Sequence, residues 1–308
     1  MAIVLAMQGA LSQGVLWGIM ALGIYITFRI LDFADLTVDG SFSTGGAICA
    51  VCVINGVDPV LAVLFASIGG AIAGFVTGFL HTKCEIPAIL AGILTQIGLY
   101  SINLRIMGRS NTPLLQTTTM FKELALKTNL SANWVALIIG MIFTIVIVAI
   151  LYWFFGTEIG SAIRATGNNE QMVRALNVNT NTTKILGLMI SNALVALSGA
   201  LVTQHQGYAD IKMGIGAIVI GLASIVIGEV ISGGKGSFAF RLSCVVAGSV
   251  IYRLIVAIVL QMGMNTDDLK LLTAILVAVA LTVPVMLAKR KQLSNYKKLT
   301  KEGDNKSC

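Results

Sequence analysis

The chain has 308 residues, of which 56% are hydrophobic and only 11% are charged. Soluble domains carry about 25% charged residues, so this composition excludes an ordinary soluble protein and is typical of a polytopic membrane protein. The net charge of +7 does not indicate nucleic-acid binding, because the cations lie at the ends of apolar runs and in the C-terminal tail rather than on one polar face with aromatic residues.

Nine apolar runs divide the sequence, and no segment of the size of a soluble domain remains between them. About 20 apolar residues cross the ~30 Å hydrocarbon layer as a helix, and most runs meet that length. The second and seventh runs are short and rich in glycine, as are broken helices beside a transport pathway. We therefore predict one all-α transmembrane domain over residues 1–308, with about eight or nine membrane helices and a short or broken second segment. The runs are 9–28, 41–57, 59–80, 87–107, 133–155, 185–204, 214–231, 239–261 and 270–288.

The lysines and arginines predict the orientation of the chain. The basic tail 289–308 holds seven of the 21 cations, so we place it in the cytoplasm. Alternating crossings then put fourteen cations inside and seven outside or in the outer half, which agrees with the positive-inside rule. The N-terminus faces outward if the second run crosses fully. If 30–57 is re-entrant, the N-terminus faces inward and the crossings number about eight.

Residues 29–46 place three carboxylates, Asp32, Asp35 and Asp39, between two apolar runs. Nearby glycines allow a broken backbone, which at membrane depth survives only where it lines a cavity or is buried in protein. Acidic residues at that depth are unfavourable and usually functional. For Asp32, a cavity and a plain interfacial loop are equal alternatives. We favour the cavity for Asp39, because the chain continues from it directly into the apolar run.

The run 59–80 is dense in small residues. Gly70, Gly74 and Gly78 form two overlapping GxxxG spacings, which let two helix backbones approach closely. In a glycine-rich membrane chain this spacing predicts close helix packing and nothing about a solute.

The run 87–107 is the most polar of the predicted crossings. Gln96, Tyr100 and Asn103 are spaced i, i+4, i+7, so they share one face of a helix. Because a lipid-facing Gln or Asn would be unfavourable, this face is predicted to point into the bundle or a water-filled path. Hydrogen bonding between helices, with no solute involved, is the alternative and has about equal weight.

The segment 108–132 is predicted to be an external loop with a short amphipathic helix near Met120–Lys127. It is a possible landing surface for an external partner, although a solvated loop is the reading we favour.

Residues 156–184 form the one long polar stretch between apolar runs, and we predict a cytoplasmic coupling loop there. Asn168 is a good helix N-cap with Gln171 three residues later, as in a capping box. The helix that it would start is about eight residues or ~12 Å long. Met172 and Leu176, with Val173 beside them, give it an apolar side that fits a groove on a partner. An ordinary solvated loop is the alternative.

Catalytic and cofactor motifs are not evident in the sequence. Residues 233–237 (GGKGS) are similar to a phosphate loop, but the residue after Lys235 is glycine, so the pattern GxxxxGK[ST] fails and we predict a turn. The five cysteines are scattered, and Cys49-x-x-Cys52 lies inside an apolar run. We expect a non-enzymatic protein with no cofactor and no metal.

Two stretches resemble the permease subunits of bacterial ABC importers in the branched-chain amino acid and ribose permease superfamily. The first includes LDFADLTVDGSF at 31–42 and is most similar to the branch of tryptophan/tyrosine or unknown-substrate uptake permeases. The second is the cytoplasmic loop, where Arg164-Ala165, Ala175 and 176–178 match the family pattern, with Asn177 where glycine is common. The overall likeness covers nearly the whole chain.

This resemblance implies a homodimer in the bacterial plasma membrane, contacting lipid and not nucleic acid. Two separate ATP-binding subunits would dock in the cytoplasm, and an extracytoplasmic solute-binding lipoprotein would deliver a small solute, with aromatic amino acids as the guess from the branch. The expected ATPase-docking residues are Arg164, Gly167, Asn168, Glu170, Met172 and Leu176. The expected translocation path includes Asp39, Gln96, Tyr100 and Asn103, together with Asn192 of the run 185–204.

A stand-alone secondary transporter driven by an ion gradient is the alternative function. Inverted repeats and a pair of intramembrane carboxylates would favour it. We find no convincing repeat, and the acidic residues lie mostly near the ends of the predicted crossings.

Overall fold

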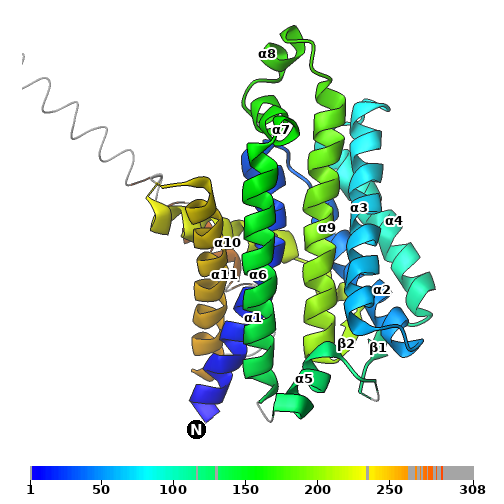
Figure 1. The fold of residues 1–308 in the computed structure, drawn as a ribbon, viewed down its shortest axis with the longest axis vertical. Helices are drawn as coiled ribbons and strands as arrows, with labels where there is room; N and C mark the ends of the chain where they lie inside the picture. Colours follow the sequence, from blue (N-terminus) through cyan, green and yellow to red (C-terminus); the bar gives the residue numbers. More distant parts are fainter. Residues whose placement is uncertain are drawn as a thin grey trace, which may run out of the picture.

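The computed structural model is a bundle of long helices (Figure 1), and it describes residues 2–262, except 116, 129–130 and 234–235, and isolated positions up to 286. Within these residues, eight helices are long and apolar enough to cross a membrane. The all-α prediction with eight or nine crossings and a short second helix is confirmed in this part of the chain. The tail 289–308, most of the run 270–288, and Gly234 and Lys235 of the predicted turn lie outside the described residues.

The eight membrane-length helices follow the predicted runs closely. The first is extended by a π-helical segment, η1 (Ile26–Ile30), and the seventh is preceded by a 3-10 segment, η2 (Ile211–Gly214). In chain order the helices are α1 (Ala2–Tyr25), α2 (Thr37–Ile54), α3 (Pro59–Thr82), α4 (Ala88–Met107), α6 (Ala132–Gly156), α9 (Thr180–Gln206), α10 (Ala217–Ser232) and α11 (Phe238–Gln261).

The two ends of the bundle differ. Two short helices, α7 (Glu158–Asn168) and α8 (Glu170–Ala175), stand beyond the long helices at one end. At the other end lie the start of α1, the helix α5 (Met120–Thr128) and a small sheet of β1 (Asn111–Pro113) and β2 (Tyr208–Asp210) (Figure 1). These strands are antiparallel, with Thr112 opposite Ala209. The helix predicted near Met120–Lys127 is therefore present as α5.

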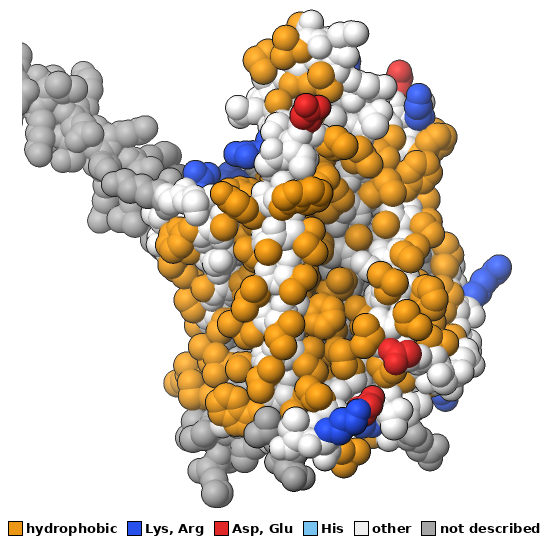
Figure 2. All heavy atoms as spheres, viewed as in Figure 1, with side chains coloured by type: hydrophobic (Ala, Val, Ile, Leu, Met, Phe, Trp, Pro, Cys, Tyr) orange, Lys and Arg blue, Asp and Glu red, His pale blue; other side chains and the backbone are white. Residues whose placement is uncertain are grey.

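Helix α9 is central, and it packs along α3, α2 and α1. Small residues make this close packing possible. A Cβ added at Gly70 or Gly74 of α3 would overlap the backbone carbonyl oxygen of Asn192 or Leu188 in α9. The outer surface is apolar instead, and Figure 2 shows hydrophobic side chains over the middle of one face, with most of the charged side chains nearer its ends or edge. This distribution fits a bundle surrounded by lipid.

Replacing one packing glycine tests this arrangement. Gly74→Ala is expected to lower the stability of the protein by about 1–3 kcal/mol, because the added methyl group forces α3 away from α9. Gly98→Ala is the matched control, since Gly98 also lies in a membrane helix but has open space where its Cβ would be. Thermal unfolding in detergent measures both, and equal midpoints for the two variants would contradict the packing.

Candidate functional site

Two broken helical segments meet inside the bundle. Helix α2 begins at Thr37, four residues before the predicted run, so Asp39 lies in its first turn. Helix α10 begins after Gly216, whose φ of 85° ends the preceding segment. The Asp39 carboxylate accepts hydrogen bonds from the backbone N–H groups of Gly216 at 2.9 Å and Ile218 at 3.0 Å. A carboxylate from α2 therefore caps the N-terminus of α10 and complements its dipole.

The junction is held by a close approach of two backbones. A Cβ at Gly214 would overlap the carbonyl oxygen of Asp39, so only glycine fits there. The N–H of Gly214 also donates to the Ser43 hydroxyl at 3.1 Å. Irregular backbone at this depth is thus paired with polar groups of α2, as membrane burial requires.

A pocket of about 380 Å³ opens beside this junction. Four of the five residues predicted for the path, Asp39, Gln96, Tyr100 and Asn103, line it together. The three α4 residues share one face, as their spacing predicts, although their exposure differs: Tyr100 is 48% exposed, whereas Asn103 is 1% exposed. The remaining lining residues come from α2, α4 and the start of the α10 region: Gly40, Ser43, Ile97, Ser101, Ile211 and Ile215.

Asn192, the fifth residue of the predicted path, does not line this pocket, and both of its amide atoms are hydrogen-bonded. Its amide nitrogen donates to the Asp35 carboxylate at 2.7 Å and to the Leu188 carbonyl at 3.0 Å, and its oxygen accepts from the Ser41 hydroxyl at 2.6 Å. The buried Asp35, for which the sequence predicted no role of its own, is thus held by α9. Its neighbour Asp32 is exposed and agrees with the plain-loop alternative.

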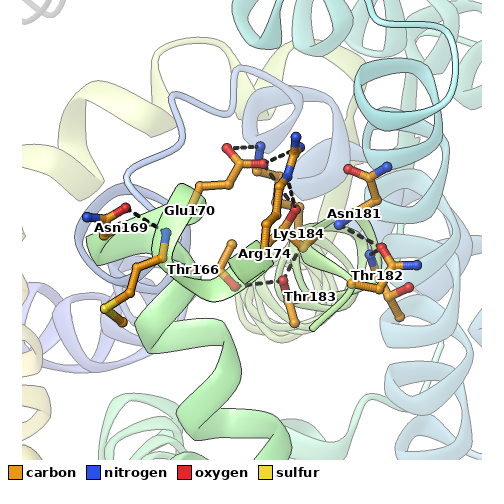
Figure 3. Close-up of polar contacts among 11 residues, drawn as sticks. Thr166, Asn169, Glu170, Arg174, Asn181, Thr182, Thr183 and Lys184 are labelled. Atoms are coloured by element: carbon orange, nitrogen blue, oxygen red, sulfur yellow. Dashed lines mark hydrogen bonds and ion pairs between the residues drawn. The ribbon is translucent and has the colours of Figure 1, made fainter. Parts of the chain in front are cut away.

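The polar stretch 156–184 forms two helices rather than the one that was predicted. Thr157 starts the unpredicted helix α7, since its hydroxyl accepts from the N–H of Gly160 at 3.3 Å. The prediction that Asn168 caps the next helix is wrong: Asn168 is the last residue of α7, and Asn169 is the cap. The Asn169 side chain accepts from the N–H of Met172 at 3.0 Å, and α8 is six residues long, not eight (Figure 3).

Glu170, a predicted docking residue, faces its own protein (Figure 3). One of its carboxylate oxygens accepts from Arg174 at 2.7 Å and from the Thr180 hydroxyl at 3.1 Å, and the other accepts from Lys184 Nζ at 2.8 Å. Burial raises the pKa of Glu170, but the hydrogen bond and charge of Lys184, with Thr180 and Arg174, outweigh burial and leave that pKa below its ordinary value. The cluster ties α8 to the start of α9.

Of the other predicted docking residues, two contact neighbouring elements of the same chain and the remaining three are exposed. Arg164 stacks over the Phe238 ring at 5.3 Å, and Gly167 packs so tightly that a Cβ would overlap the Ile30 carbonyl oxygen. Asn168 is exposed. The apolar pair is also exposed, Met172 at 51% and Leu176 at 68%.

Val173, which lies between the members of that pair in sequence, is only 2% exposed and packs inward. Asn177, which stands where glycine is common in the resembling family, has a φ of 62°, in the left-handed region that glycine and asparagine adopt most readily. Helix α8 therefore turns Val173 to its own protein and Met172 and Leu176 to solvent.

An ion pair links this end of the molecule to α10. Arg29 of η1 donates to both carboxylate oxygens of Glu229, with Nη2 to Oε2 at 2.6 Å. Because Gly167 of α7 packs on Ile30 in the same segment, α7, η1 and α10 form a continuous chain of contacts. This chain of contacts ends at the N-terminus of α10, which lies at the pocket.

Comparison with known proteins gives the family. A sequence profile described as branched-chain amino acid transport system / permease component matches residues 6–283. A tyrosine transport system permease protein of Clostridioides difficile is 42% identical, covering 87% of each chain, and the uncharacterized protein RP368 of Rickettsia prowazekii is 36% identical over 89% of this chain and 95% of that one. The ribose import permease protein RbsC of Escherichia coli is 26% identical over 73% and 70%.

These matches and the eight membrane-length helices agree with the resemblance found in the sequence and decide against the stand-alone secondary transporter. The chain belongs to the branched-chain amino acid transport system permease family and is a multi-pass permease subunit of an ABC importer of the bacterial inner membrane.

Proposed function

We propose that this chain forms, as a homodimer, the membrane path of an importer for an aromatic amino acid. Two ATP-binding subunits would supply the energy, and an external solute-binding lipoprotein would deliver the solute. The observation that carries the proposal is the exposed pair Met172, in α8, and Leu176, directly after it. The ion pair between Glu170 and Lys184 fixes this short helix to α9. The name of the Clostridioides difficile relative, a tyrosine transport system permease protein, supports the solute class.

Helix α8 is suited to docking because it is both apolar on the outside and anchored. Exposed Met and Leu side chains on one short helix fit a hydrophobic groove, the usual recognition mode of an amphipathic helix. The Glu170 cluster prevents α8 from swinging freely, so a push on Met172 or Leu176 would move α9 as well. A mobile loop would absorb the same displacement.

Two contact routes lead from α8 towards the pocket. One passes through Glu170 and Lys184 into α9. The other passes from α7 through Gly167 and η1 to the Arg29–Glu229 pair and α10. Closure of the ATP-binding subunits would tilt these helices and change access to the pocket, as rigid-body rocking does in transporters generally.

The pocket itself supports the homodimer. Its wall residues Ile97, Tyr100 and Ile215 are exposed in the single chain, with the aromatic ring of Tyr100 at the surface. Asp39 and Gln96 also line this pocket, and such side chains facing lipid would be unfavourable. A second copy covering this face would close the pocket and place the path between the two chains.

The docking assignment is tested by charge substitution. Met172→Asp or Leu176→Asp should reduce co-purification of the ATP-binding subunit by at least about tenfold, because each buries a carboxylate in an apolar groove. Leu126→Asp is the matched control, since Leu126 is also an exposed apolar residue, at 79%, but lies in α5 at the opposite end. If both α8 variants keep the subunit bound and solute uptake intact, the assignment is wrong.

The anchoring role of Glu170 is tested by a double-mutant cycle with Glu170→Gln and Lys184→Met. Each single change should loosen residues 170–184 by about 1–3 kcal/mol, and the double variant should lose less than the sum. Hydrogen exchange of this segment measures the effect.

Hydrogen exchange of residues 170–184 can also be measured as a function of pH. The lowered pKa of Glu170 means that the cluster stabilises the segment above the ordinary carboxyl pKa, and that this stabilisation is lost as the pH falls through the lowered value. Additive single effects, or protection that does not change on acidification, would contradict the anchoring role.

A further inference from the structure

Asn103 is the one residue of the pocket wall whose hydrogen bonding is incomplete in a way that points to a ligand. It is 1% exposed, and among the residues that the structure describes neither its amide nitrogen nor its amide oxygen has a partner. A buried amide without partners is unfavourable, and native proteins keep such groups where something else completes them. Asn103 is one of the residues that line the pocket, and its two amide atoms are covered in this state, so a molecule that reaches them from the pocket would complete their hydrogen bonding.

Asn192 shows what a structural asparagine looks like in the same bundle. It is also fully buried, but both of its amide atoms have partners: the nitrogen donates to Asp35 and Leu188, and the oxygen accepts from Ser41. The contrast indicates that the incomplete bonding of Asn103 is a property of its site and not of buried asparagines in this fold.

The charged residues that line the pocket limit the kind of ligand that it can bind. Asp39 uses one acceptor position on each carboxylate oxygen for α10, and an ionised carboxylate has about four such positions, so further donors can bind. The described lining residues include an acid and no lysine or arginine. In a low-dielectric surrounding this arrangement attracts a cation and repels a free anion.

We propose that this pocket binds the ammonium end of a zwitterionic amino acid, an inference that rests on the proposed function and specifies its ligand. The ammonium group donates to Asp39 and to the amide oxygen of Asn103. The amide nitrogen of Asn103 donates to the carboxylate of the solute. The side chain of the solute lies among Ile97, Tyr100 and Ile215.

The first test separates recognition from stability. Asn103→Leu replaces an unpartnered amide by an apolar group of similar size, so the melting temperature should stay the same or rise. Uptake of tyrosine at low concentration by vesicles with the complete importer should fall at least about tenfold.

The matched control is Asn192→Leu, which removes bonded groups and should lower the melting temperature. A drop in stability for Asn103→Leu, or unchanged uptake at unchanged stability, would overturn the proposal.

The second test concerns charge and needs neither ATP nor the binding protein. Ser101 lines the pocket and is exposed, so Ser101→Cys can be labelled with a maleimide in membranes, with the unsubstituted chain giving the background. Tyrosine and tyramine, which carry an ammonium group, should slow labelling at least about tenfold more than 4-hydroxyphenylpropionate, which has only the carboxylate. Asp39→Asn should abolish the protection by tyramine.

The outcomes of the two proposals differ. If the three compounds protect equally, or the carboxylate compound protects best, the ammonium site is wrong even though tyrosine uptake stands. If tyramine protects but the complete importer does not take up tyrosine, the proposed solute is wrong and the ammonium site stands.

Discussion

A helix that begins inside a membrane must find partners for its first N–H groups, because neither water nor lipid is available to supply them. Helix α10 starts within the candidate span Ile211–Ser232 rather than at its end, and the Asp39 carboxylate supplies those partners. This one cap fixes the first turn of α2 against the α10 region. Together with one face of α4, these two segments line the pocket.

Helix α10 is held by polar contacts at both of its ends. One end of the helix is capped at the pocket by Asp39, and the other carries Glu229, which pairs with Arg29 next to the packing site of α7. A rigid helix held at both ends carries displacement along its axis. The ion cluster around Glu170 does the equivalent for α8 and α9. The chain thus has continuous contacts between its α7 and α8 end and the pocket.

The sequence predicted best what depends on local spacing. The membrane helices follow from apolar runs, and the shared face of Gln96, Tyr100 and Asn103 follows from helical period. The hydrogen bonding of Asn192 could not be predicted, because its partners Asp35 and Ser41 are more than 150 residues away in sequence and no local pattern shows that its amide is already bonded.

The cytoplasmic end shows the same limit. Asn168 and Asn169 are chemically identical as caps, and only the extended backbone of Asn169, with a φ of −157°, selects it. No local pattern shows that Lys184, fourteen positions after Glu170, pairs with it once α9 has formed.

The most direct measurement is solute accumulation in vesicles of defined composition. With the ATP-binding subunit, the binding protein and ATP all present, the chain should concentrate labelled tyrosine, and removing ATP should stop accumulation completely. Purified chain alone should give none under a proton or sodium gradient. Accumulation by the chain alone, driven by such a gradient without nucleotide, would contradict an importer that draws its energy through α8.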